Sequence, residues 1–153
     1  MSDQFDSNER PDFDIEIKNI AEYVATPLKA SDEAKETAYA CLLDSLGCGL
    51  LALRYPECVK HLGPRLGLNA SSGQVRVPGT HFQLDPEKAA WDIGCIIRWL
   101  DYNDTWLAAE WGHPSDNLGA ILAVADFVSQ RNRAEGKAAI GLDTVLEAMI
   151  KAH

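Results

Sequence analysis

Two apolar runs with a polar stretch between them constrain the fold of this chain more than any other feature. The runs cover residues 89–97 and 118–125, and each is apolar nearly all round. Helices without a polar face are buried against other elements. The stretch between them, residues 98–117, carries acids, a threonine, three tryptophans and a histidine. A polar segment that joins two buried helices is expected to lie at a cleft, so we look for function there.

Apolar residues at spacings of three and four predict further helices on both sides of this stretch. Ser31 is a good N-cap for the longest of them, and Asp85 followed by Pro86 is a strong helix start. Asp12 or Asp14 caps the first helix. The predicted helices cover residues 13–26, 31–54, 57–62, 85–100, 116–131 and 142–152.

The predicted fold class is all-α, with about six helices, two of them nearly fully buried. A minor β element is expected near residues 74–80, which alternate weakly and end in a Pro-Gly turn. Residues 1–11 are polar and predict a flexible tail, so the single domain covers residues 12–153. Because the last helix stops at His153 without a stop signal, we expect this domain to be part of a larger helical one.

The overall charge excludes some classes of partner. A net charge of −9 argues against nucleic acid, since phosphate binding needs a basic surface. No apolar run approaches the roughly 20 residues of a membrane span, and the polar N-terminus does not resemble a secretory signal, so a cytoplasmic location is expected. Only 14 Lys and Arg are present, scattered along the chain, so a polyanionic substrate would need cations from elsewhere.

The four cysteines are Cys41, Cys48, Cys58 and Cys95, and none of them forms a C-x-x-C pair. An iron–sulfur or zinc site is one interpretation, but the spacing does not fit the known ligand patterns. We therefore expect small packing residues and no bound metal.

The polar stretch contains the groups needed for proton transfer. Asp101 and Thr105 share a face if the turn between them stays helical. His113 precedes Pro114, which predicts extended backbone just ahead of a helix N-terminus. The backbone N–H groups after Ser115 then form an anion site beside the imidazole, which suits a substrate that carries carboxylates.

A plainer interpretation of the same residues stays open. Asp101 and Asp104 can be solvated or capping acids, and His113 can be a packing histidine. Most tryptophans are expected in the core or in a cleft wall, and only Trp106 and Trp111 lie in the loop where they could line a pocket.

Residues 98–106 and 110–117 resemble the MmgE/PrpD family, and within it the members that dehydrate 2-methylcitrate in propionate catabolism. Residues 41–49, 77–80 and 149–153 are also similar to that family, so the resemblance covers the chain after residue 11. It implies a helical domain that faces a smaller lid domain built from later sequence, with a small tricarboxylate substrate bound between them. It also implies no cofactor, no iron–sulfur cluster, and a homodimer for the full-length enzyme.

The family includes cis-aconitate decarboxylase, whose site has an Asp, a Thr three intervening residues on, and a His-Pro-Ser. Asp101, Thr105 and His113 match that motif, although the interval between the Thr and the His is longer here. The resemblance implies that Asp101 and His113 are the catalytic acid and base, in either order. It further implies that Thr105, Trp106 and Ser115 bind substrate.

The implied reaction is the loss of water from 2-methylcitrate to give 2-methyl-cis-aconitate, a hydro-lyase activity. One alternative is a family relative that acts on citrate or cis-aconitate, and a second is a non-catalytic helical interaction module. We expect the 153-residue chain alone to be inactive, because half of the cleft would be missing.

Overall fold

The computed structural model describes residues 11–66, 74–107 and 109–153. Most of the predicted tail lies outside this range, which includes only its residue 11. The described part of the chain is mostly helical, which confirms the all-α prediction. Its elements are α1 (Ile15–Ala25), α2 (Asp32–Ala52), α3 (Pro56–Val59), β1 (Val75–Arg76), β2 (Gln83–Leu84), α4 (Pro86–Arg98), β3 (Trp106–Leu107), β4 (Trp111–Gly112), the 3₁₀ helix η1 (Pro114–Asn117), α5 (Leu118–Ala134) and α6 (Leu142–Ala152).

The predicted capping residues begin the three helices for which they were named. The side chains of Asp14, Ser31 and Asp85 accept hydrogen bonds from backbone N–H groups three residues on, at 2.9, 3.2 and 3.0 Å. Each bond satisfies an N–H group that the helix itself leaves without an acceptor. The first residues of α1, α2 and α4 could therefore be predicted from the local sequence.

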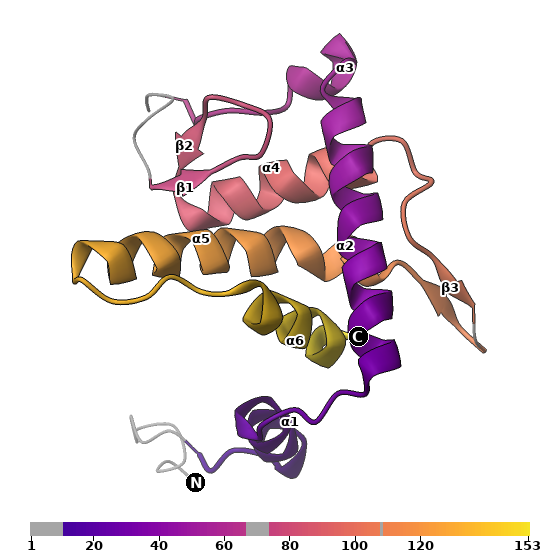
Figure 1. The fold of residues 1–153 in the computed structure, drawn as a ribbon, viewed down its shortest axis with the longest axis vertical. Coiled ribbons are helices and arrows are strands. Elements are labelled where there is room, and N and C mark those ends of the chain that lie inside the picture. The colour runs from indigo at the N-terminus through magenta and orange to yellow at the C-terminus, as the bar shows by residue number, and fades with distance from the viewer. Residues whose placement is uncertain (1–10, 67–73, 108) are drawn as a thin grey trace, which may run out of the picture.

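Helices α4 and α5 lie side by side, and α2 crosses them near the ends that meet the polar stretch (Figure 1). The close approach of α4 and α5 depends on Gly119. A Cβ atom at this position would lie 2.5 Å from the carbonyl oxygen of Ala90 and 2.9 Å from the backbone nitrogen of Gly94. The polar stretch thus leaves one of two tightly packed helices and returns into the other.

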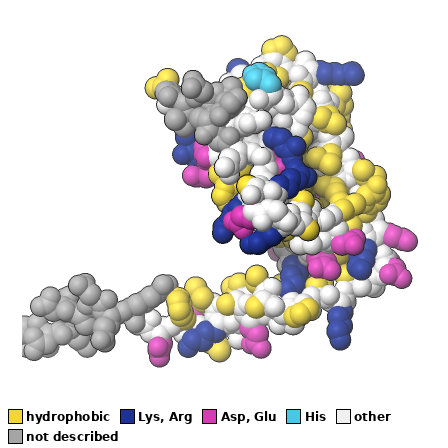
Figure 2. Space-filling model, turned by 60° about the vertical axis from the view of Figure 1, so that its left-hand side comes forward, with side chains coloured by type: hydrophobic (Ala, Val, Ile, Leu, Met, Phe, Trp, Pro, Cys, Tyr) yellow, Lys and Arg dark blue, Asp and Glu magenta, His cyan; other side chains and the backbone are white. Residues whose placement is uncertain are grey.

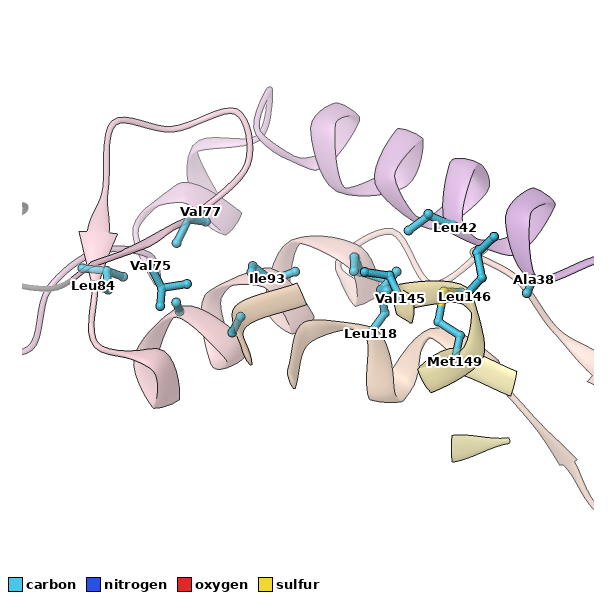
Figure 3. Close-up of a cluster of buried hydrophobic side chains, with 13 residues drawn as sticks. Ala38, Leu42, Val75, Val77, Leu84, Ile93, Leu118, Val145, Leu146 and Met149 are labelled. Carbon is cyan, nitrogen blue, oxygen red and sulfur yellow. The ribbon is translucent and has the colours of Figure 1, made fainter. Parts of the chain in front are cut away.

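The core joins side chains from both ends of the chain (Figure 3). Val75, Val77 and Leu84 of the first hairpin region pack at one end, over Ile93 of α4. At the other end, α2 and α6 close over α5 through Ala38, Leu42, Leu118, Val145, Leu146 and Met149. The β1–β2 pair confirms the small β element expected near residues 74–80.

The prediction that two helices are buried on nearly all sides is wrong for this chain by itself. Trp91 of α4 and Val124 of α5 are 55% and 56% exposed. The outer face of α5 and the neighbouring face of α6 form an open apolar groove, whose lining includes Ile121, Val124 and Ala148. Each helix therefore leaves part of its surface uncovered by the described residues.

Helix α1 lies apart from the core and has no buried residue. In Figure 2 it extends from the body along the lower edge, with apolar side chains on its surface. The ammonium group of Lys151 holds its C-terminal end by donating hydrogen bonds to the carbonyl oxygens of Tyr23, Val24 and Thr26. No helix among the described residues is long and apolar enough to cross a membrane.

Candidate functional site

The polar stretch begins where α4 ends, at Arg98. Three residues later, Asp101 has a φ of +56°, in the left-handed region that L side chains rarely adopt. The turn is therefore not helical, and the prediction that Asp101 and Thr105 share a helical face is wrong. A left-handed residue after a helix is usually glycine, and an aspartate there costs about 1 kcal/mol of backbone strain. Such strain is typical of positions retained for their side chain.

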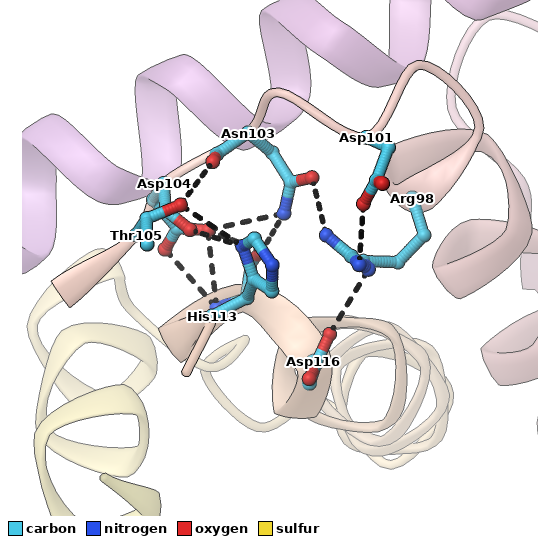
Figure 4. Close-up of polar contacts among 8 residues, drawn as sticks. Arg98, Asp101, Asn103, Asp104, Thr105, His113 and Asp116 are labelled. Carbon is cyan, nitrogen blue, oxygen red and sulfur yellow. Dashed lines mark hydrogen bonds and ion pairs between the residues drawn. The ribbon is translucent and has the colours of Figure 1, made fainter. Parts of the chain in front are cut away.

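Arg98 organises the first half of the stretch (Figure 4). Its guanidinium donates to the Asp101 carboxylate at 2.7 Å and to the Asn103 side-chain oxygen at 2.8 Å. It also forms an ion pair with the Asp116 carboxylate at 3.3 Å. The Asp101 side chain is nonetheless 74% exposed. Asp101 is therefore held in place on one side and open to solvent on the other.

The second half of the stretch is centred on Asp104. Its carboxylate accepts the backbone N–H of Ser115 at 3.0 Å and also the Ser115 hydroxyl. Ser115 is only 1% exposed. The sequence predicted an anion site at this helix N-terminus, and in the structure the anion there is the carboxylate of Asp104. Asp104 thus acts as a capping acid from outside the helix, as the plainer interpretation had it.

His113 has the extended backbone that Pro114 predicted, with φ −112° and ψ 109°. Its Nδ1 atom lies 2.8 Å from the backbone carbonyl oxygen of Asp104 and 3.2 Å from the hydroxyl oxygen of Thr105. A carbonyl oxygen only accepts, so this geometry assigns the proton of the neutral ring to Nδ1. The lone pair is then on Nε2, which makes no hydrogen bond within the described residues. Neutral His113 is in the form that can act as a base.

A pocket of about 450 Å³ lies on the other side of Thr105, whose hydroxyl contacts this imidazole; His113 itself is not in the pocket lining. Thr105, Trp106 and Pro114 line one side, and residues of α2 and α6, including Cys41 and His153, line the other. The indole of Trp106 meets the ring of His153 edge to face, with centroids 4.7 Å apart. Trp111 makes a similar contact with His113 at 5.6 Å.

Cys41 lines the pocket, and its thiol is less acidic than an ordinary cysteine thiol. Its pKa is raised by burial, by the negative charge of Asp104 and by a hydrogen bond to that carboxylate. Cys41 is therefore a protonated, weakly nucleophilic group at neutral pH. The thiols of all four cysteines are free, and the described residues contain no cluster of three or more His, Cys, Asp or Glu that could hold a metal ion.

The structure brings four of the five predicted site residues together. Thr105 contacts His113 directly, Ser115 reaches it through Asp104, and Trp106 lies beside Thr105 in the pocket lining. Asp101 is the exception, since its hydrogen bond goes to Arg98 and none joins it to His113 within the described residues. Figure 4 shows Asp101 on the Arg98 side of Asn103, and His113 on the Asp104 and Thr105 side.

Sequence reasoning missed two residues of the site, Arg98 and Asn103. The spacing of Arg98 and Asp101 was the available signal for the first, because residues three apart at a helix end can form an ion pair. Nothing distinguished Asn103 from an ordinary loop asparagine. A sharp turn between Arg98 and Thr105 buries it, and that turn depends on contacts with η1 that are distant in sequence.

The geometry defines a candidate acid–base site in a helical domain. The site consists of the Thr105 hydroxyl, the His113 imidazole with its defined tautomer and the Asp101 carboxylate held by Arg98, all at the end of two paired helices. A family model for the MmgE/PrpD N-terminal domain matches residues 18–153. The chain belongs to the MmgE/PrpD family.

Several similar proteins are named 2-methylcitrate dehydratase. The chain is 59% identical over 147 residues to 2-methylcitrate dehydratase of Escherichia coli K12, which covers 96% of this chain and 30% of the relative. It is 54% identical over 153 residues to 2-methylcitrate dehydratase of Cupriavidus necator, covering 100% of this chain and 32% of the relative. The mitochondrial 2-methylcitrate dehydratase of Yarrowia lipolytica is 50% identical over 155 residues, again with 30% of the relative covered. The chain thus spans about a third of the length of these relatives.

Proposed function

We propose that this chain is the N-terminal part of a hydro-lyase that converts 2-methylcitrate into 2-methyl-cis-aconitate in propionate catabolism. The observation that carries the proposal is His113, whose Nδ1 is fixed by the Asp104 carbonyl oxygen and by Thr105, a residue that lines the neighbouring pocket. The names of the relatives support 2-methylcitrate as the substrate, and the matched family model covers the residues of the candidate site.

The reaction needs one base and one acid. A C–H bond next to a carboxylate and a C–O bond to the hydroxyl break, a C=C bond forms, and water leaves. We assign these roles to His113 and Asp101, without fixing which is the base. The Nδ1–H tautomer favours His113 as the base, because Nε2 then has a lone pair.

Asp101 has the complementary features of the second group. It is exposed to solvent and therefore to a ligand, it is oriented by Arg98, and it occupies a strained backbone position. A carboxyl group within reach of the leaving hydroxyl would supply a proton to it. For this proton transfer, either the Asp101 side chain moves toward the pocket or the substrate bridges Asp101 and His113. Both possibilities belong to this proposal.

We assign substrate binding to Thr105, Trp106 and Ser115. Thr105 and Trp106 line the pocket, where a hydroxyl and an indole suit the polar and apolar parts of the substrate. Ser115 is buried and bonded to Asp104, so its part in binding would require that contact to loosen. The role of Ser115 is therefore the one that the geometry supports least.

The rest of the enzyme would complete both the cleft and the core. Three substrate carboxylates need cations, and Arg98 is already shared by Asp101, Asp116 and Asn103. We infer that the additional cations come from sequence that the relatives have and this chain lacks. The open apolar groove between α5 and α6 supports a larger helical domain, since exposed grooves of this kind are contact surfaces. A homodimer and a cytoplasmic location belong to the same proposal.

The test is product analysis with the full-length protein that contains this chain. Purified enzyme is given 2-methylcitrate, citrate and cis-aconitate in separate reactions. The proposal expects a conjugated tricarboxylate from 2-methylcitrate at the highest kcat/KM, and no turnover by the 153-residue chain alone. Preference for citrate or decarboxylation of cis-aconitate would favour the alternative family activity. No turnover of any of the three by the full-length protein would favour an interaction module.

A further inference from the structure

Asn103 is a buried polar side chain of the polar stretch with hydrogen-bond partners on both its oxygen and its nitrogen. It is 2% exposed. Its side-chain oxygen accepts from the Arg98 guanidinium at 2.8 Å, and its side-chain nitrogen donates to the Ser115 hydroxyl at 2.7 Å and to the Asp104 carboxylate at 3.2 Å. A buried group with this many partners holds its neighbours in one arrangement.

The chemistry of these neighbours selects an amide. A guanidinium can only donate hydrogen bonds, and an ionised carboxylate can only accept them. The side chain between Arg98 and Asp104 must therefore present an acceptor on one side and a donor on the other. Asparagine does so with a single flat group of the right length. An aspartate of the same shape would present an acceptor on both sides.

The two sides of this amide carry the two proposed catalytic groups. Arg98, on one side, holds the Asp101 carboxylate at 2.7 Å. Asp104, on the other, holds Nδ1 of His113 at 2.8 Å through its backbone carbonyl oxygen. No hydrogen bond joins Asp101 to His113 within the described residues, and Asn103 links their two sides through its side chain (Figure 4). A second route runs from Arg98 to Asp116, whose backbone N–H donates to the His113 carbonyl oxygen at 3.0 Å.

We propose that Asn103 is a positioning residue that sets the placement of Asp101 relative to His113 for proton transfer. This inference rests on the proposed function of both groups. Displacement of a reacting group by about 1 Å can cost roughly a hundredfold in rate. The Asn103 side chain is not part of the pocket lining and acts through Arg98, Asp104 and Ser115. Its backbone carbonyl oxygen also accepts from the hydroxyl of Thr105 at 3.2 Å, a contact that a change of side chain leaves in place.

The discriminating variant is Asn103→Asp in the full-length protein. The charged groups facing this position are Arg98 from α4 and Asp104 from the same loop, while the Cys41 thiol of α2 faces Asp104. Burial and the Asp104 carboxylate raise the pKa of the introduced carboxyl, whereas the Arg98 guanidinium lowers it, so the variant is compared with wild type at both the acid and the alkaline end of the active range. Protonated, it donates an O–H toward Asp104 in place of the amide N–H.

The expected result is a new pH dependence. The kcat of Asn103→Asp should be within about threefold of wild type at low pH and fall by roughly tenfold to a hundredfold as the carboxyl ionises, with a much smaller change in KM. Asn132→Asp is the matched control, because Asn132 lies at the far end of α5 and donates only to the Ala138 carbonyl oxygen among the described residues. Its pH profile should follow wild type.

A kcat of Asn103→Asp equal to that of wild type at all pH values would overturn the inference. Crystal structures of wild type and Asn103→Asp at high pH decide the matter independently of activity. The proposal expects the Asp101–His113 separation to change by about 1 Å or more in the variant. Failure of wild type to act on 2-methylcitrate would show that the proposed function is wrong. An unchanged Asp101–His113 separation in the variant would show, independently of activity, that the positioning inference is wrong.

Discussion

The ring nitrogen Nδ1 of His113 lies 3.2 Å from the hydroxyl oxygen of Thr105, eight residues earlier in the chain. Thr105 lines the neighbouring pocket, and the Asp104 carbonyl oxygen fixes the tautomer of the His113 ring. The hairpin of β3 and β4 lies between them and brings the two residues back together. The arrangement of the site therefore depends on this hairpin, and its function and its stability can be measured separately.

Asp101 is expected to matter for turnover more than for folding. Asp101→Gly removes the carboxylate and also relieves the left-handed backbone strain, so the free energy of unfolding should stay within about 1 kcal/mol of wild type. Turnover of the full-length protein should fall roughly a hundredfold. Urea unfolding and kcat measure the two effects. Asp101→Asn, which keeps the size of the side chain, should be as inactive; full activity in either variant would remove Asp101 from the mechanism.

The buried carboxylate of Asp92 makes Lys88 a strong stability determinant. Asp92 is fully buried, and it accepts from the Lys88 ammonium and from the backbone N–H of Gly63 at 2.8 Å. Lys88→Met would leave a buried charge without its partner and should cost about 3–5 kcal/mol. Arg65→Met is the control, because Arg65 pairs with the exposed Glu87, and it should change stability little. Equal effects in denaturant unfolding would contradict this account.

The contact between α4 and α5 predicts opposite outcomes for two glycines. Gly119→Ala places a methyl group 2.5 Å from the Ala90 carbonyl oxygen and should destabilise the protein by about 2 kcal/mol or more. Gly94→Ala meets nothing within 4 Å and should be neutral or stabilising by up to about 1 kcal/mol, from helix propensity. Thermal unfolding of both variants checks the pair. A tolerated Gly119→Ala would mean that the helices are further apart than described.

Cys58 should make the protein less stable in alkali. Burial and the neighbouring Cys95 raise the pKa of its thiol from 9.0 to about 11. Below pH 9 the thiol is protonated in both states. Between pH 9 and 11 the unfolded chain loses this proton while the folded chain keeps it, so stability falls as pH rises. Cys58→Ala should weaken that fall relative to its own value at pH 7, and an unchanged slope would exclude Cys58 as its source.

The helices were predictable because their signals are local. Ser31 and Asp85 stand directly before apolar residues at helical spacing, and each side chain caps the helix that it precedes. The exposure of Trp91 and Val124 was not predictable from composition, because apolar residues look the same whether or not a neighbour covers them.

The site was predictable in its residue types but not in its connections. The motif located Thr105 and His113, and Pro114 correctly predicted extended backbone at His113. The left-handed turn at Asp101 and the burial of Asn103 depend on Arg98 and Ser115, whose contacts cross from α4 to η1. Such long-range hydrogen bonds leave no periodic signal in the sequence. The same contacts explain why Asp104 occupies the predicted anion site.

The most direct test of the central claim is the rate of 2-methylcitrate dehydration by the full-length protein carrying His113→Gln. The glutamine keeps a polar side chain but has no group that takes a proton at neutral pH. The account predicts a loss of kcat of roughly a hundredfold or more, with wild-type unfolding behaviour. His81→Gln serves as the control, since His81 is exposed and lies outside the site, and it should keep full activity. Near-normal turnover by His113→Gln would contradict the proposal that this imidazole carries out proton transfer.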